Sequence, residues 1–165
     1  MKVIYALFGR YADARGAVKE LLDQGYNDDE MNVIVQADIA HEHMDLDFSS
    51  VGVEVTDEVG TRTSRGLDPF LAAHTPVPVP GLGEVYAAGD LATMLVKAAM
   101  VHGAGADGLQ SALKDFVPLD VAQAFAGGIS RGGLLFWIRT GDERGGIAAQ
   151  TLRRYHGQYV DDYVG

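Results

Sequence analysis

The two ends of this 165-residue sequence repeat one pattern, a strand followed by a helix and a second strand, and this repeat limits the fold most strongly. Each predicted strand is a short run of β-branched, aromatic and other apolar residues. Each predicted helix carries apolar residues three and four positions apart. The N-terminal unit comprises residues 3–8, 11–24 and 31–35, and the C-terminal unit comprises residues 134–138, 142–155 and 158–164, after a helix at 118–126.

Two such units are typical of an α+β fold, the ferredoxin-like split βαβ sandwich. We predict a single domain over residues 1–165, in which 1–36 and 117–165 form the two halves of the sandwich. Residues 37–116 are then an insertion, which is too long for a structureless loop. Its first part is acidic, with a short strand predicted at 51–55, and its Ala/Gly-rich remainder is predicted to be largely helical.

Both faces of the predicted sheet are apolar. Val3, Tyr5 and Leu7 alternate with side chains that are equally apolar, and the strand at 134–138 is apolar at every position. A sheet face of this kind left open to water would be a larger apolar patch than a soluble monomer shows. Either the insertion or a second subunit must cover the second face, and the apolar faces lead us to expect a homo-oligomer.

Composition excludes several classes of function. The chain contains no cysteine, which removes disulfides, thiolate metal sites and cysteine nucleophiles. Its formal charge of −10 repels nucleic acid and anionic membrane surfaces, so neither is expected as a partner. The longest apolar stretch, residues 82–105, contains Glu84, Asp90 and Lys97, which disqualify a simple transmembrane helix. We therefore expect a soluble, cytoplasmic protein.

Three segments carry a family resemblance. They are Val3-Ile4-Tyr5-Ala6-Leu7-Phe8 with Ala12-Asp13-Ala14, Pro80-Gly81-Leu82-Gly83 with Ala87-Ala88-Gly89-Asp90, and Gly127-Gly128-Ile129-Ser130-Arg131-Gly132-Gly133 with Asp142-Glu143-Arg144. Together these segments resemble the bacterial heat-induced general stress protein family, whose members are small proteins of unknown biochemical activity. The resemblance implies a bacterial stress-associated protein and supplies no catalytic residues.

Two glycine motifs match catalytic or cofactor-binding patterns only in their letters. Residues 128–132 match G-x-S-x-G, but a nucleophile elbow needs a strand before the serine and a helix after it, and the predicted order is the reverse. Residues 103–108 match G-x-G-x-x-G, but a dinucleotide site needs a preceding strand, and residues 92–102 are predicted to be helical. We interpret the first motif as a helix-to-strand turn and the second as a link between helices.

His41 and His43 are candidate metal ligands within an acidic segment. In an extended segment both side chains would point the same way, because side chains repeat every two residues along a strand. A tight site needs three or four protein ligands, and only Asp45, Asp47 or a distant histidine could complete it. We therefore predict a solvated loop with no stoichiometric metal, and no cofactor.

Three functions remain open. The first is a non-enzymatic, stress-associated protein that acts by self-association or by binding a protein partner. The second is a small-molecule binding module with a pocket between the sheet and the insertion, and the third is a metal binder or metal-dependent enzyme that uses His41 and His43. Trp137 is expected to be buried in the middle of its strand. The residues predicted to line the small-molecule pocket are Tyr5, Phe136, Trp137 and Arg131.

Overall fold

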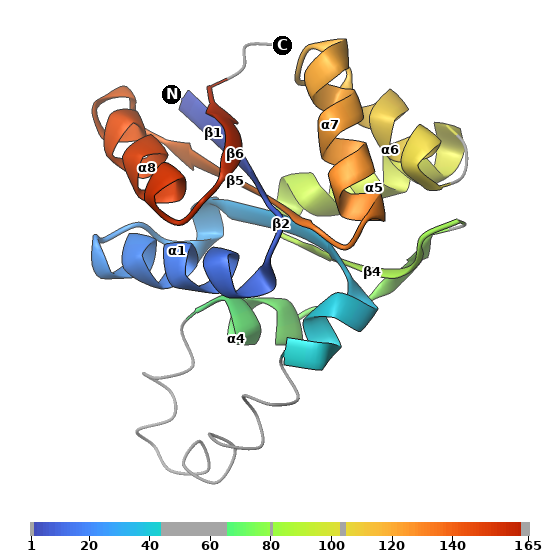
Figure 1. The fold of residues 1–165 in the computed structure, drawn as a ribbon, viewed down its shortest axis with the longest axis horizontal. Coiled ribbons are helices and arrows are strands. Elements are labelled where there is room, and N and C mark those ends of the chain that lie inside the picture. Colours follow the sequence, from blue (N-terminus) through green and yellow to red (C-terminus); the bar gives the residue numbers. More distant parts are fainter. Residues whose placement is uncertain (1, 44–65, 80, 103–104, 163–165) are drawn as a thin grey trace, which may run out of the picture.

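The chain folds as a mixed α+β structure around a six-stranded antiparallel sheet (Figure 1). The computed structural model describes residues 2–43, 66–79, 81–102 and 105–162. The strand order across the sheet is β3-β4-β2-β5-β1-β6. The strands are β1 (Lys2–Phe8), β2 (Met31–Gln36), β3 (Val77–Val79), β4 (Gly83–Ala88), β5 (Leu134–Thr140) and β6 (Gln158–Asp161).

The two ends of the chain interleave in the sheet. β5 lies between β1 and β2, and β1 lies between β5 and β6, so each strand–helix–strand unit receives one strand from the other unit. In the register of these strands, Trp137 of β5 pairs with Tyr5 of β1 on one side and with Asn32 of β2 on the other. The central strands are therefore buried on both edges, as their uninterrupted apolar sequences require.

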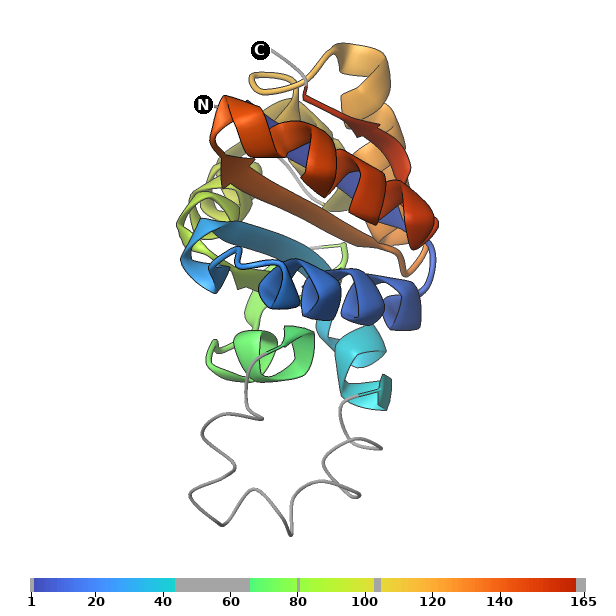
Figure 2. The same ribbon diagram turned by 90° about the vertical axis from the view of Figure 1, so that its left-hand side faces the viewer.

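Two long helices, α1 (Tyr11–Asp23) and α8 (Asp142–Arg154), cover one face of the sheet (Figure 2). The short helix α4 (Leu67–Ala72) packs beside α1. Side chains from alternate positions of the strands, among them Ile4, Phe8 and Phe136, form the apolar core of this layer. α1 ends as its sequence predicts, because Gly25 adopts a φ of +97°, the left-handed conformation that favours glycine after a helix.

Helices α5, α6 and α7 cover the opposite face, so both faces of the sheet are buried within one chain (Figure 1). Tyr5, Leu7 and Trp137 point into this second layer. α5 and α6 belong to the insertion, which resolves the alternative left open by the sequence: the two apolar faces no longer argue for a second subunit. None of the described helices is long and apolar enough to cross a membrane. The helices are α5 (Asp90–His102), α6 (Gly105–Leu113) and α7 (Leu119–Ser130).

Where the structure describes it, the insertion is largely helical, as predicted, and it also extends the sheet with two short strands. β3 and β4 form a hairpin whose second strand pairs with β2, from Val33 opposite Ala88 to Gln36 opposite Val85. An apolar run as short as that of β4 suits a helix or a strand equally, and pairing with β2 decides between them. The strand predicted at 51–55 lies outside the described residues.

The G-x-S-x-G segment is a helix-to-strand turn, as predicted. α7 runs through Gly128 to Ser130, and β5 begins at Leu134, so a helix precedes the serine and a strand follows. Gly132 has a φ of +95°. A side chain at Gly133 would place its Cβ 2.8 Å from the carbonyl oxygen of Gly128. α7 continues past the predicted end at 126 to Ser130, and Gly128 within it packs against Leu7 of β1.

Most of the second glycine motif, residues 105–108, lies in the first turn of α6. α5 ends at His102 and α6 begins at Gly105, and the element before the motif is a helix, as predicted. A Rossmann-type phosphate site needs a strand at that place. The prediction of a link between helices is therefore wrong for residues 105–108, which form the start of α6 in the second layer.

Candidate functional site

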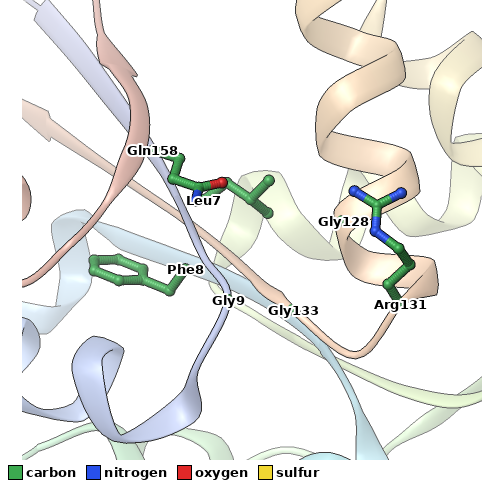
Figure 3. A pocket seen from close by; sticks show the side chains of 7 residues that line it. All are labelled: Leu7, Phe8, Gly9, Gly128, Arg131, Gly133 and Gln158. Atoms are coloured by element: carbon green, nitrogen blue, oxygen red, sulfur yellow. The ribbon is translucent and has the colours of Figure 1, made fainter.

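A cleft lies at the end of β1, where two cavities of about 280 and 410 Å³ adjoin. Gly9 and Gln158 line both cavities, so the two form one continuous depression. Figure 3 shows the first cavity between the start of β6 and the last turn of α7. It is lined by Leu7, Phe8, Gly9, Gly128, Arg131, Gly133 and Gln158. The second is lined by Gly9, Arg10, Asp13, His156 and Gln158.

Glycines form much of the cleft wall, and packing requires two of them but not the third. Gly128 and Gly133 are required by packing, because a Cβ at Gly128 would lie 2.6 Å from a methyl of Leu7, and one at Gly133 would meet backbone oxygens. Gly9 meets no such restriction, since a Cβ there would have no atom within 4 Å. Gly9 therefore leaves an exposed stretch of backbone along the part of the wall that both cavities share.

The cleft brings together two arginines for which the described residues supply no charged partner. Neither Arg10 nor Arg131 forms a side-chain hydrogen bond or an ion pair with any residue that the structure describes. By contrast, the guanidinium groups of four other arginines are held by carboxylates or backbone carbonyls. These are Arg15 with Asp68, Arg144 with Gln24, Arg153 with Val160, and Arg154 with Glu20. The unpaired cations of the cleft are therefore available to a ligand.

Arg131 follows α7 directly, and its guanidinium lies over Gly127 (Figure 3). Its Nη1 is 3.1 Å from the position that a Cβ of Gly127 would occupy, so a larger residue there would displace it. Arg10 immediately precedes α1, and its side chain does not cap that helix. Each arginine therefore stands at a helix end beside the cleft.

His156 lines the cleft in a strained backbone conformation. It follows the end of α8 with a φ of +69°, at a position where glycine is the usual residue. Tyr159, on the other side of Gln158, has a φ of +55°. A residue with a Cβ in this region costs about 1 kcal/mol, and such strain gathers at functional sites. Glycine would adopt this φ without strain. The histidine that stands here instead places its imidazole at the second cavity.

Chemically, this arrangement is suited to holding an anion. Two guanidinium groups, an imidazole and the Gln158 amide supply hydrogen-bond donors, and Asp13 supplies an acceptor. The lining of the two cavities includes no hydroxyl or amine side chain, so these residues offer no nucleophile of the Ser, Thr or Lys type. The arginine, histidine and glutamine side chains of the lining are suited to binding an anion through hydrogen bonds.

Of the four residues predicted to line a ligand pocket, only Arg131 lines this cleft. Tyr5 and Trp137 are buried under α7, with ring centroids 5.6 Å apart. Phe136 points into the opposite layer and is fully buried, so grouping it with Trp137 was wrong. Adjacent residues of a strand face opposite sides of the sheet, which separates these two.

The sequence analysis missed Arg10, His156 and Gln158. One signal for Arg10 was available, because Gly9-Arg10 follows an apolar strand and precedes a helix. Turns between strands and helices are common places for binding residues. His156 and Gln158 carried no comparable signal, since their approach to Gly9 depends on β6 pairing with β1.

Burial raises the pKa of the Tyr5 phenol from 10.0 to about 12. The phenol of the unfolded chain ionises near its ordinary pKa, so the folded state binds the proton more tightly. Its stabilisation is complete below pH 10 and is lost as the pH rises through 12.

We expect the wild-type free energy of unfolding to fall by about 2–3 kcal/mol more than that of Tyr5→Phe over this interval. Urea unfolding at a series of pH values between about 9 and 12 measures both slopes. Tyr26, whose pKa burial also raises, remains in the variant and accounts for a residual slope. Identical slopes in the two proteins would contradict the assignment.

The side chains of His41 and His43, predicted to point the same way, do not do so. Their segment is helical rather than extended, so side chains two positions apart diverge. His41 Nε2 lies 2.8 Å from the Tyr86 hydroxyl, and the ring of His43 stacks on Tyr11 with centroids 4.9 Å apart. Within the described parts of the chain, no three His, Cys, Asp or Glu side chains are grouped to hold a metal. The acids predicted to complete the site belong to residues 44–65, outside the described residues.

Comparisons with protein-family models, curated proteins and solved structures find no match to this chain. The resemblance to the general stress family therefore stays an expectation.

Proposed function

We propose that this protein is a non-enzymatic binding module for a small anionic molecule, held in the cleft at the end of β1. The observation that carries the proposal is the convergence of Arg10 and Arg131, two arginines without a partner among the described residues, on a cleft walled by glycine. A guanidinium group binds carboxylate and phosphate through two parallel hydrogen bonds. The exposed backbone at Gly9 leaves room for a ligand to approach both side chains.

The charge of the chain supports a selective site rather than general anion binding. The formal net charge is −10, so the surface as a whole repels anions. The cleft, with two guanidinium groups that have no partner among the described residues, is a local positive region on this negatively charged surface. An anion bound here is held by a specific site rather than by a diffuse basic surface.

The test is the affinity of inorganic phosphate and of acetate, measured by isothermal titration calorimetry at low ionic strength in a buffer without competing anions. We expect Arg131→Gln or Arg10→Gln to weaken binding of at least one of these anions by about fivefold or more, since each removes a charge-assisted hydrogen bond. Arg139→Gln is the matched control, because Arg139 lies outside the cleft and its side chain forms no hydrogen bond or ion pair with the described residues. Undetectable binding, or an equal loss in Arg139→Gln, would contradict the proposal.

A second candidate function, self-association, has its own observation. Met94, Met100 and Val101 on α5 are 63, 42 and 84% exposed. Asp90 and Lys97 are the only Asp, Glu, Lys or Arg residues of α5, and their charges cancel. Two copies of an acidic chain can approach along this helix without like-charge repulsion, and a symmetric pairing of α5 with its copy would bury the apolar side chains.

Light scattering measures the mass directly. Self-association through α5 predicts a multiple of 17.6 kDa for the wild type and the mass of one chain for Val101→Lys. A wild-type mass of 17.6 kDa at micromolar concentration would exclude this function.

We also propose that β6, β1, β5 and β2, with α1 and α8, form a ferredoxin-like core to which the β3–β4 hairpin is added. The strand order and the two interleaved strand–helix–strand units support this assignment. The resemblance to the bacterial heat-induced general stress family implies a bacterial stress-associated protein and supplies no catalytic residues. An experimental structure with a different strand order would overturn the core assignment.

A further inference from the structure

The two cavities of the cleft are lined by different hydrogen-bond donors. Arg131 lines only the first cavity, whereas Arg10 and His156 line only the second. Gly9 and Gln158 line both and carry no charge. The cleft therefore has a positive group on each side of a neutral, polar middle.

The topology explains why these groups stand apart. Leu7 points into the layer of α7 and Phe8 into the layer of α1 and α8, so the chain at Gly9 lies where the two layers meet at the end of β1. Arg131 comes from the α7 side of the sheet. Arg10 and His156 come from the start of α1 and the end of α8, on the other side.

We infer that the ligand carries two anionic groups joined by a short polar or neutral linker, one held by Arg131 and the other by Arg10 and His156. This inference rests on the proposed function and deepens it by naming the class of ligand. A single small anion bound beside Arg131 makes no contact with Arg10 and His156 in the second cavity. A molecule with an anionic group at each end pairs both sets and places its linker against the Gln158 amide and the Gly9 backbone.

Asp13 strengthens the case for one tethered molecule over two separate anions. Its carboxylate lines the second cavity beside Arg10 and His156 and reduces the positive charge there. A free anion is therefore held more weakly at this end than at Arg131. Once the first group of a ligand is bound, its second group is supplied at high effective concentration, and modest attraction suffices.

The experiment compares linear dicarboxylates from succinate to adipate with monocarboxylates of the same chain lengths. Affinity is measured by calorimetry on the wild type, Arg10→Gln, Arg131→Gln and the control Arg139→Gln. We expect one dicarboxylate to bind about tenfold more tightly than its matched monocarboxylate, because a second charge-assisted contact is added. Each of Arg10→Gln and Arg131→Gln should abolish that gain, and Arg139→Gln should retain it. Thermal melting of each variant verifies that these exposed substitutions leave the fold intact.

The outcomes separate the inference from the function on which it rests. If no dicarboxylate binds more tightly than its matched monocarboxylate, or if the gain survives Arg10→Gln, the inference is overturned. Monocarboxylate or phosphate binding that still depends on Arg131 would then leave the proposed function standing. If no acid and no phosphate binds in an Arg131- or Arg10-dependent manner, the proposed function fails and the inference fails with it.

Discussion

Replacing Trp137 with alanine is expected to lower the free energy of unfolding by about 3–5 kcal/mol. Trp137 is 1% exposed in the middle of β5, and its ring stacks on Tyr5 with centroids 5.6 Å apart. Its indole Nε1 has no hydrogen-bond partner among the described residues, so the loss comes from packing and from the cavity left behind. In a close-packed interior, neighbouring side chains relax too little to fill the cavity that such a truncation leaves.

Urea denaturation of the two proteins measures this effect. Ile147→Ala is the control, because Ile147 on α8 is 48% exposed and its truncation should change the free energy of unfolding by less than about 1 kcal/mol. Trp137→Phe should lose less than Trp137→Ala, since it keeps an aromatic ring and removes a buried donor. A Trp137→Ala protein as stable as the Ile147→Ala control would show that β5 is not a core strand.

Gly89→Ala is expected to destabilise the protein by about 3 kcal/mol or more, through two independent effects. Gly89 has a φ of +105°, which a residue with a Cβ rarely adopts. A Cβ there would also lie 2.6 Å from the carbonyl oxygen of Met31 and 2.4 Å from Asn32 Oδ1. The backbone of β2 cannot move away without disturbing its pairing with β4 and β5.

The collision with Asn32 has a further consequence for α5. Asn32 Oδ1 accepts the backbone N–H groups of Leu91 and Ala92, each at 3.0 Å, and so caps the start of that helix. Displacing this buried side chain leaves the donors of the first turn without their acceptor. Gly89→Ala therefore loosens the attachment of α5 to the sheet as well as straining the turn.

Gly146→Ala is the matched control for this variant. Gly146 is exposed within α8, and a Cβ there would have no atom within 4 Å. The same chemical change should stabilise the protein by about 0.5–1 kcal/mol, because alanine favours a helix over glycine. Equal effects of the two substitutions on the urea midpoint would contradict the geometry assigned to Gly89.

The elements at the ends of the chain were predictable because their signals are local. The runs at 3–8 and 134–138 are strands in the structure, and the stripe at 11–24 is α1, ending one residue earlier at Asp23. Neighbouring residues set these periodicities, so the sequence carries them without reference to the rest of the fold. The turn at Gly132 was predictable for the same reason, because it depends on neighbouring glycines.

Other features depended on partners distant in the sequence. The short apolar run of β4 became a strand through its pairing with β2 about fifty residues earlier, which no local pattern records. The side chains of His41 and His43 point in different directions because their segment is helical, and each ring contacts a different tyrosine. Phe136 and Trp137 are adjacent in sequence, and the two covered faces of the sheet placed them in separate cores.

The amino-acid sequence by itself determined the interleaving units and the need to cover both faces of the sheet, because apolar surface must leave water whichever element covers it. Only the tertiary structure decided that the insertion supplies that cover. The cleft likewise exists only in three dimensions, since Arg10, Arg131 and His156 come from three separate turns. The pairing of β6 with β1 and the close approach of α7 to β1 bring those turns together, and both are long-range contacts that local residue patterns do not specify.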